Sequence, residues 1–462
     1  MYAYHTLSST WVWELDLFAV KSIRGYFASR YHPLILQALS LAAFGLVLVY
    51  SFAGNPHGEN NLASSVVWFF WWPLLPFLTF FAGRIWCAIC PLATITSFLL
   101  KPFGAASKSR GDSLGKYGIW FSGALLLILS WGFVVWRIEG TPRNTGVLLL
   151  ALLLGAVSAG VIFGRLSWCR HFCPIGVLAG LYSTVAVVEL RPQADLCRSR
   201  CGRRSCPASE RSKICLLAQP FSSIDGNQSC NLCGDCIKNC RHGSPRLHLR
   251  WPGRELLRPA RPSVDVAVVI ATLMAVLLLD MIRMTPLYPS YMKLALQSGL
   301  AGEYELAFSA SMALLSIGVI AALTVASALG ALLTRESAIV SFARFAYVLL
   351  PLILAAHLGS SLFHWLAHGT RPILAIFREL GIPTDLPPVV RGSIYVVNEP
   401  LRVLQLTLML IGLVWAVYLV WRLAVGRGDK PLWGEVVPHA GLVVALAAAL
   451  VFLFTLPMGM LH

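Results

Sequence analysis

The sequence predicts an all-α polytopic membrane protein with about nine transmembrane helices and one small soluble insert. Apolar residues make up 57% of the 462 residues and charged residues only 13%, whereas soluble globular domains carry about 25% charged residues. Apolar runs of about 20 residues, the length that crosses a bilayer core of about 30 Å, recur along the chain. This composition excludes a disordered chain and a small disulfide-linked secreted protein.

Four segments are expected. Residues 1–32 form an N-terminal segment in which Trp11–Tyr31 is predicted to be an amphipathic helix lying on the membrane. Residues 33–190 contain four spans in two related units, residues 191–262 form the soluble insert, and residues 263–462 contain five further helices. The nine expected spans are approximately 33–53, 65–82, 117–136, 146–164, 264–283, 305–333, 338–363, 401–422 and 437–458.

The basic residues predict an orientation. With the N-terminus inside, most of the 37 Lys and Arg residues fall in cytoplasmic segments, as the positive-inside rule requires. We therefore expect a multi-pass protein of the bacterial inner membrane with its N-terminus and soluble insert in the cytoplasm. Topology and anionic lipid headgroups explain the net charge of +16, so we expect membrane lipid as a partner and no nucleic acid.

All 12 cysteines lie between Cys87 and Cys240, on the expected cytoplasmic face. Thiols are kept reduced there, so metal or redox chemistry is favoured over a disulfide framework.

Four of the cysteines belong to an internal repeat. The sequences GRIWCAICP (83–91) and GRLSWCRHFCP (164–174) each follow an apolar helix and share a Gly-Arg pair, a Trp and a cysteine pair closed by proline. Parallel repeats of this kind are related by an axis along the membrane normal, which would gather the thiols near the inner headgroups. We expect Arg84 and Arg165 to anchor the helices at that interface. The four cysteines are Cys87, Cys90, Cys169 and Cys173.

Two interpretations of these four thiols stay open. They form a third redox site, either as ligands of a third iron–sulfur cluster or as redox-active thiols that handle copper or electrons. Alternatively, they are ordinary buried cysteines at helix turns, where proline simply begins the next helix. Repetition of the whole unit favours the first interpretation.

The insert carries the strongest motif. Within CNLCGDCIKNC, Cys230, Cys233, Cys236 and Cys240 follow the Cys-x2-Cys-x2-Cys-x3-Cys spacing of bacterial 4Fe-4S ferredoxins. A tetrahedral zinc site, the alternative, usually takes two separated cysteine pairs. The sequence therefore predicts a small ferredoxin-like cytoplasmic insert.

A second cysteine set precedes this motif. In two-cluster ferredoxins the fourth cysteine of such a run binds the other cluster, so we expect two [4Fe-4S] clusters. The second set departs from the regular spacing, and Arg241 stands where proline normally follows the last cysteine. One predicted cluster is held by Cys230, Cys233, Cys236 and Cys215, and the other by Cys197, Cys201, Cys206 and Cys240.

These features together resemble the membrane-bound polyferredoxins of the NapH, NosR and CcoG type, over roughly residues 33–260. Cys169, Cys173 and Pro174 match that family's Cys-x3-Cys-Pro element, whereas Cys87 and Cys90 are one residue closer together. The resemblance implies electron transfer between quinol or cytoplasmic donors and periplasmic reductases, or electron supply for metal handling and oxidase assembly. The five helices after residue 263 are not explained by it.

An outer redox site in those five helices would supply an intermediate, without which electrons on the inner face cannot cross the whole hydrocarbon thickness. His357, His364 and His368 lie at the outer end of one helix, and Asp280 and Met284 at that of another. His and Met side chains there would build a copper, iron or quinone site, and His364 and His368, four residues apart on one face, are its best candidates. The competing interpretation is interfacial histidines, gap-filling methionines and an Asp280–Arg283 pair.

The leading hypothesis is an electron-transfer subunit, rather than a stand-alone enzyme, that passes electrons between a cytoplasmic or quinone partner and a periplasmic redox protein or reductase. The alternative is a metal-handling protein that reduces or moves copper or iron through the membrane cysteines and outer His and Met groups. In a third hypothesis, the clusters only stabilise a scaffold.

Overall fold

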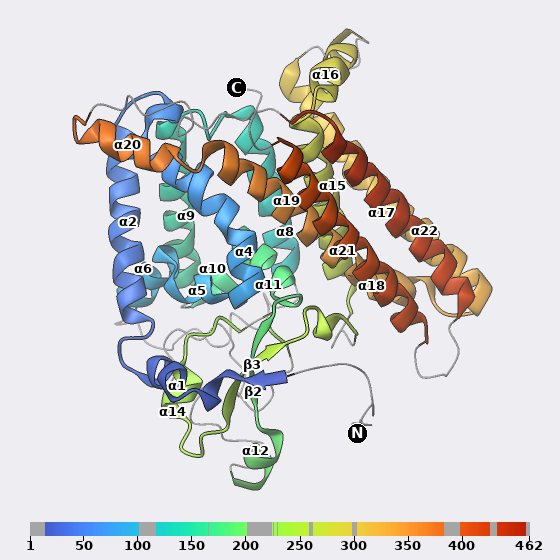
Figure 1. Ribbon diagram of the computed structural model, residues 1–462, viewed down its shortest axis with the longest axis horizontal. Coiled ribbons are helices and arrows are strands. Elements are labelled where there is room, and N and C mark those ends of the chain that lie inside the picture. The colour runs from blue at the N-terminus through green and yellow to red at the C-terminus, as the bar shows by residue number, and fades with distance from the viewer. Residues whose placement is uncertain are drawn as a thin grey trace.

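The computed structural model describes residues 14–100, 117–164, 166–200, 224, 226–228, 230–257, 262–297, 303–382, 398–425 and 432–458. Long helices run side by side through most of the molecule, and a small sheet with short helices lies at one end (Figure 1). This arrangement confirms a mostly helical membrane protein with a small insert.

Within the described residues, nine helical segments are long and apolar enough to cross a membrane, and all nine coincide with the predicted spans. Their length follows directly from the apolar runs. The segments are α2 (Leu34–Ala53), α3 to α4 (Leu62–Ala82), α8 (Gly118–Val135), α9 (Pro142–Phe163), α15 (Val264–Arg283), α17 (Tyr304–Thr334), α18 to α20 (Ala338–Glu379), α21 (Asn398–Val425) and α22 (Trp433–Thr455).

Several of these segments are built from shorter pieces. The second span consists of α3 (Leu62–Ser64), a π-helix η3 (Ser65–Trp71) and α4 (Trp72–Ala82), and the seventh of α18 (Ala338–Phe345), η6 (Ala346–Leu349), α19 (Leu350–His368) and α20 (Arg371–Glu379). Helices α16 (Leu287–Gln297) and α20 lie at the end of the bundle opposite the sheet (Figure 1). The remaining short turns are η1 (Leu17–Ala19), η2 (Gly58–Asn60) and η5 (Arg254–Leu257).

The two cysteine hairpins have the same construction. The first runs from α4 through Gly83 into α5 (Ile85–Ile89) and α6 (Pro91–Leu99), and the second from α9 through Gly164 into α10 (Ser167–His171) and α11 (Pro174–Ser183). Both glycines have positive φ, at 57° and 101°, a region that side chains disfavour. In each unit the second cysteine caps a helix whose first residue is proline, which is pre-organised for that position.

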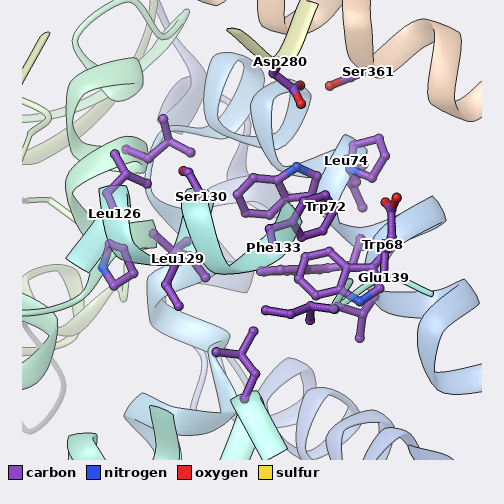
Figure 2. Close-up of a pocket in the computed structure, with 18 of the residues that line it drawn as sticks. Trp68, Trp72, Leu74, Leu126, Leu129, Ser130, Phe133, Glu139, Asp280 and Ser361 are labelled. Atoms are coloured by element: carbon purple, nitrogen blue, oxygen red, sulfur yellow. The ribbon is translucent and has the colours of Figure 1, made fainter. Parts of the chain in front are cut away.

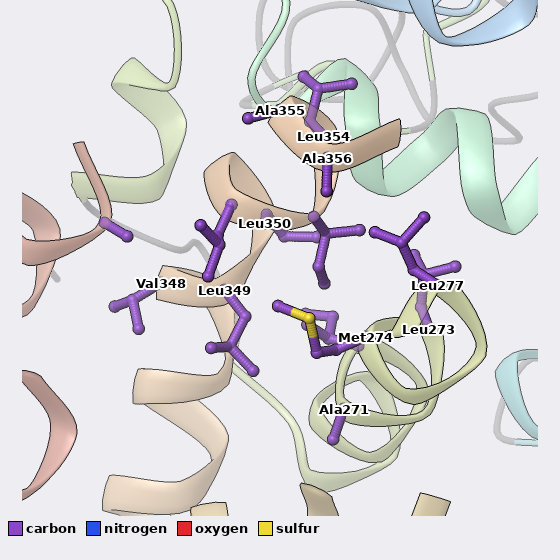
Figure 3. Close-up of a cluster of buried hydrophobic side chains, with 14 of the residues drawn as sticks. Ala271, Leu273, Met274, Leu277, Val348, Leu349, Leu350, Leu354, Ala355 and Ala356 are labelled. Carbon is purple, nitrogen blue, oxygen red and sulfur yellow. The ribbon is translucent and has the colours of Figure 1, made fainter. Parts of the chain in front are cut away.

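The C-terminal helices share one hydrophobic core with the cysteine hairpins. Helix α15 packs Met274 and Leu277 against Leu349 and Leu350, which lie on η6 and the start of α19 (Figure 3). Leu178 and Leu181 of α11 belong to the same buried cluster. The five helices that sequence reasoning left unexplained are thus continuous with the hairpins.

The insert contains a three-stranded antiparallel sheet in the order β1-β3-β2. Strands β2 (Val188–Pro192) and β3 (Pro245–Arg250) belong to the insert region, and α12 (Ala194–Arg200) and α14 (Asp235–Asn239) accompany them. The edge strand is β1 (Glu14–Asp16), contributed by the N-terminal segment.

That edge strand differs from the amphipathic helix expected over Trp11–Tyr31. Residues 14–16 are extended because they pair with β3. The α-helix within the expected range is the shorter α1 (Lys21–Ala28). Helix α1 packs against α14 of the insert. Residues 11–13 lie outside the described part of the chain.

A buried ion network fastens the insert to the second hairpin. Arg250, fully buried, bonds to Glu189 at 2.5 Å and Glu255 at 2.7 Å. Its guanidinium also donates to the main-chain oxygens of Ser183 and Thr184, where α11 ends. These contacts satisfy carbonyls that the helix end leaves unpaired, so the insert sits directly beneath the cysteine hairpins.

Candidate functional site

The structure brings the four membrane cysteines together. Cys87 lies on α5 and Cys169 on α10, while Cys90 and Cys173 cap the helices that follow. Cys87, Cys90 and Cys169 pack around the same small apolar cluster of Ala93 and Leu166. Cys87 and Cys90 raise the pKa of the Cys173 thiol, as expected for neighbouring thiols. The parallel repeat therefore produces the convergence that the sequence predicted.

Burial dominates the acidity of these thiols. It raises the pKa of Cys90 to about 11 and that of Cys173 to about 12, and it holds the pKa of Cys169 well above its ordinary value. The neighbouring thiols add to the effect, whereas Arg84 lowers the pKa of Cys169 and Cys173. Iron or another metal binds cysteine as thiolate, so loading this site would release protons.

Arg84 connects the membrane cysteines with the ferredoxin motif. Its side chain is 7% exposed, and its guanidinium donates to the main-chain oxygen of Gln228, two residues before Cys230. It is therefore buried inside the protein, and the interface anchor expected from the sequence is wrong for this residue. The main-chain oxygen of Gln228 gives its guanidinium a hydrogen-bond partner inside the protein. Arg165 lies outside the described residues.

The backbone approaches the membrane cysteines closely. The main-chain N–H of Gly176 donates to Cys173 Sγ at 3.3 Å. A Cβ atom on Gly176 would lie 3.1 Å from Cys169 O and 3.3 Å from Arg84 Nη2, closer than side chains normally pack. An N–H donor on a cysteine sulfur is one of the contacts that tune iron–sulfur sites.

The insert places its cysteines on a tight loop followed by a short helix. Cys230 and Cys233 are buried, and Cys236 lies on α14. Two residues of this loop have positive φ: Leu232, between Cys230 and Cys233, at 55°, and Gly234, directly after Cys233, at 79°. The His32 ring bonds to the main-chain oxygen of Leu232 at 3.0 Å, so the segment before the first span braces the loop.

Cys240 shares a contact residue, Ser244, with Cys197 of the second cysteine set. Ser244 contacts both sulfurs: its N–H donates to Cys240 Sγ at 3.4 Å, and its Oγ lies 3.1 Å from Cys197 Sγ. Cys240 and Cys197 are thereby neighbours although 43 positions separate them in the chain. The other three predicted ligands, Cys201, Cys206 and Cys215, lie outside the described residues.

The predicted outer metal site stays a prediction. In the part of the chain that the structure describes, no group of three or more His, Cys, Asp or Glu side chains is arranged to hold a metal ion. His364 Nδ1 lies 3.0 Å from the main-chain oxygen of Ser360, and the His368 ring packs on Phe69 with the centroids 5.3 Å apart.

Sequence reasoning missed the site contacts of four residues. Each of them contacts a cysteine or the loop that carries one: Arg84, His32, Gly176 and Ser244. The repeated Gly-Arg pair was a signal for Arg84, because an arginine kept at the same point of both units suggests a shared role. Nothing in the local sequence distinguishes Gly176 or Ser244.

Comparisons with known proteins fall on the same residues. Residues 64–110 and 145–187 match a family described as a 4Fe-4S binding domain, and these are the two cysteine hairpins. The chain is also 25% identical over 205 residues to the methylamine utilization ferredoxin-type protein MauN of Paracoccus denitrificans. That alignment covers 40% of this chain and 66%, just under two thirds, of the relative. No solved structure matches.

The resemblance to membrane-bound polyferredoxins is thereby confirmed: two hairpins of the chain match a 4Fe-4S binding domain, the chain is similar to a ferredoxin-type protein, and its described residues contain nine candidate membrane spans.

Proposed function

We propose that this protein is a membrane-embedded electron carrier that passes electrons between a partner on the cytoplasmic side or within the membrane and a periplasmic redox protein. One observation carries the proposal. The two hairpins that match a 4Fe-4S binding domain converge on four cysteines, and Arg84 links them to the ferredoxin loop. Two places suited to iron–sulfur chemistry are thus adjacent within one fold.

The donor atoms fit 4Fe-4S clusters. Such a cluster takes up and releases one electron at a time and is held by four cysteine thiolates. Cys87, Cys90, Cys169 and Cys173 supply one set, with Gly176 donating an N–H to a sulfur. The proposed third cluster occupies this set, in addition to the two clusters of the insert.

The partition of the insert cysteines follows the ferredoxin exchange. Cys197 and Cys240 meet at Ser244, which supports assigning Cys240 to the set of Cys197, Cys201 and Cys206. The loop cysteines Cys230, Cys233 and Cys236 then take Cys215 as their fourth ligand.

The proposed orientation places the insert in the bacterial cytoplasm. The Lys and Arg distribution supports it, and the insert lies at one end of the helical bundle (Figure 1). In this orientation electrons are held at the inner face, and their exchange with a periplasmic partner requires an intermediate that crosses the membrane.

Redox titration of anaerobically purified protein tests this function. Low-temperature electron paramagnetic resonance should show 4Fe-4S signals that appear on reduction with dithionite and disappear on oxidation with ferricyanide. Cys233→Ser should remove one signal and leave the others, because it touches only the insert loop. The proposal fails if the protein carries no iron, or if its iron does not change oxidation state under these reagents.

A further inference from the structure

A large cavity lies between the cysteine hairpins and the C-terminal helices. Its volume is about 500 Å³, and η3, α4, α8, α15 and α19 all contribute to its wall. Figure 2 shows Trp68, Trp72 and Phe133 facing the open space, with Leu126 and Leu129 along one side. Most of the wall is apolar, and Trp71 and Trp86 add further aromatic surface.

The cavity reaches from the cysteines toward the opposite face. Cys90 and Pro91 of the first hairpin line one part of it. Asp280 and His364 line another, and Asp280 lies in the last turn of α15, the helix that starts directly after the insert. The space therefore begins beside the membrane cysteines and extends along α15 away from the insert.

A buried hydrogen-bonded pair joins the two halves of the molecule at this cavity. Tyr182 Oη, on α11 just after the second cysteine hairpin, lies 2.8 Å from Nδ1 of His357 on α19. Tyr182 is 1% exposed, and the His357 ring also packs near Trp72 with the centroids 6.3 Å apart. Both members of the pair line the cavity.

The aromatic wall has an unusual backbone. Residues Ser65–Trp71 form a π-helix, and Val67, Trp68 and Trp71 of that segment line the cavity. π-helical segments are rare and occur frequently at functional sites.

We propose that this cavity binds a quinone, with its ring at the Tyr182–His357 pair and its apolar tail along the tryptophan-rich wall. The inference rests on the proposed function, because it names the carrier that exchanges electrons with the membrane cysteine site. A lipid acyl chain would need no buried hydrogen-bonding pair, and buried polar groups are retained at a cost. Ligand sites of this kind are mostly apolar with a few placed polar groups.

The chemistry balances with these residues. Conversion of a quinone to its quinol consumes two electrons and two protons, and each ring carbonyl becomes a hydroxyl. The electrons come singly from the reduced iron–sulfur sites of the proposed function, and the protons pass through Tyr182 and His357. Asp280 lines the same cavity and pairs with Arg283 at 3.2 Å, and because its side chain is 44% exposed it would take up protons from solvent. The same path runs backward when quinol is the donor.

Quinone binding is measured directly by fluorescence. The full-length protein in lipid nanodiscs is titrated with decylubiquinone, and quenching of the cavity tryptophans is followed. Saturable quenching is expected, and Leu129→Phe, which fills the cavity, should weaken it about tenfold or more. Ile128→Phe is the matched control, because Ile128 is the neighbouring residue, does not line the cavity and is 53% exposed; its binding should be unchanged.

Electron exchange gives a second readout that separates this inference from the proposed function. Protein reduced with dithionite, then freed of the reductant, is mixed with decylubiquinone or with ferricyanide. Both should reoxidise the wild type, and Tyr182→Phe should slow the quinone reaction about tenfold while the ferricyanide reaction keeps its rate.

Three results would overturn the quinone site. One is reoxidation by ferricyanide without quinone binding, which leaves the proposed function standing. Another is quenching that Leu129→Phe and Ile128→Phe affect equally, as expected for lipid-dissolved quinone alone. The last is a haem absorption band in the purified protein, which would assign the cavity to a different group. Protein without redox-active iron would instead refute the proposed function.

Discussion

The buried ion network around Arg250 predicts how much free energy holds the insert in place. Arg250→Met removes a fully buried cation that bonds to Glu189 and Glu255. Removing one partner of a buried ion pair costs about 3–5 kcal/mol, because the other charge is left uncompensated. Both carboxylates keep Arg191 as a partner, at 2.9 Å and 2.5 Å, so the loss should lie at the lower end, about 3 kcal/mol.

Hydrogen exchange measures this loss where it occurs. A change of about 3 kcal/mol corresponds to about a hundredfold faster exchange for the amides of β2 and β3, provided they exchange by local opening. Mass spectrometry of the full-length protein in nanodiscs can resolve these strands from the membrane helices. The amides of α17, which is remote from the network, serve as the internal reference.

A neighbouring arginine provides the control. Arg254 lies 3.9 Å from Glu189, and its side chain is 42% exposed, so Arg254→Met should cost less than about 1 kcal/mol. If the two variants accelerate exchange by the same factor, the network does not fasten the insert and the reasoning is refuted.

Further predictions concern the cysteine sites. Arg84→Leu should lower the midpoint potential of the membrane cysteine site, since a nearby positive charge favours the reduced state; potentiometric electron paramagnetic resonance would show the shift, and an unchanged potential would contradict it. Gly176→Ala should reduce bound iron, because the added Cβ crowds the cysteine backbone, while Gly45→Ala, which meets open space, should not. Cys197→Ser and Cys240→Ser should abolish the same spectroscopic signal; loss of different signals would overturn the ligand partition.

The helical scaffold could be predicted from the sequence because membrane spans depend on local composition. Runs such as 146–164 need about 20 apolar residues whatever they pack against, and the structure has all nine. The gathering of Cys87 and Cys169 was also predictable, since two copies of one unit in the same orientation place equivalent residues side by side.

The remaining features depend on contacts between distant segments. Strand β1 has only three residues, too few for a periodic signal, and it is extended because β3 supplies its hydrogen bonds. Arg84 is buried because its guanidinium donates to the main-chain oxygen of Gln228, 144 positions away in the chain. Likewise, the Tyr182–His357 pair joins residues 175 positions apart, so no local pattern could have revealed the cavity that they share.

Iron and acid-labile sulfide counted per chain test the central claim most directly. The account predicts about twelve irons per wild-type chain, four for each of three clusters. It predicts about eight in the Cys169→Ser/Cys173→Ser double variant, with the insert signals retained. Equal iron content in the wild type and the double variant would show that the membrane cysteines hold no cluster, and would contradict the account.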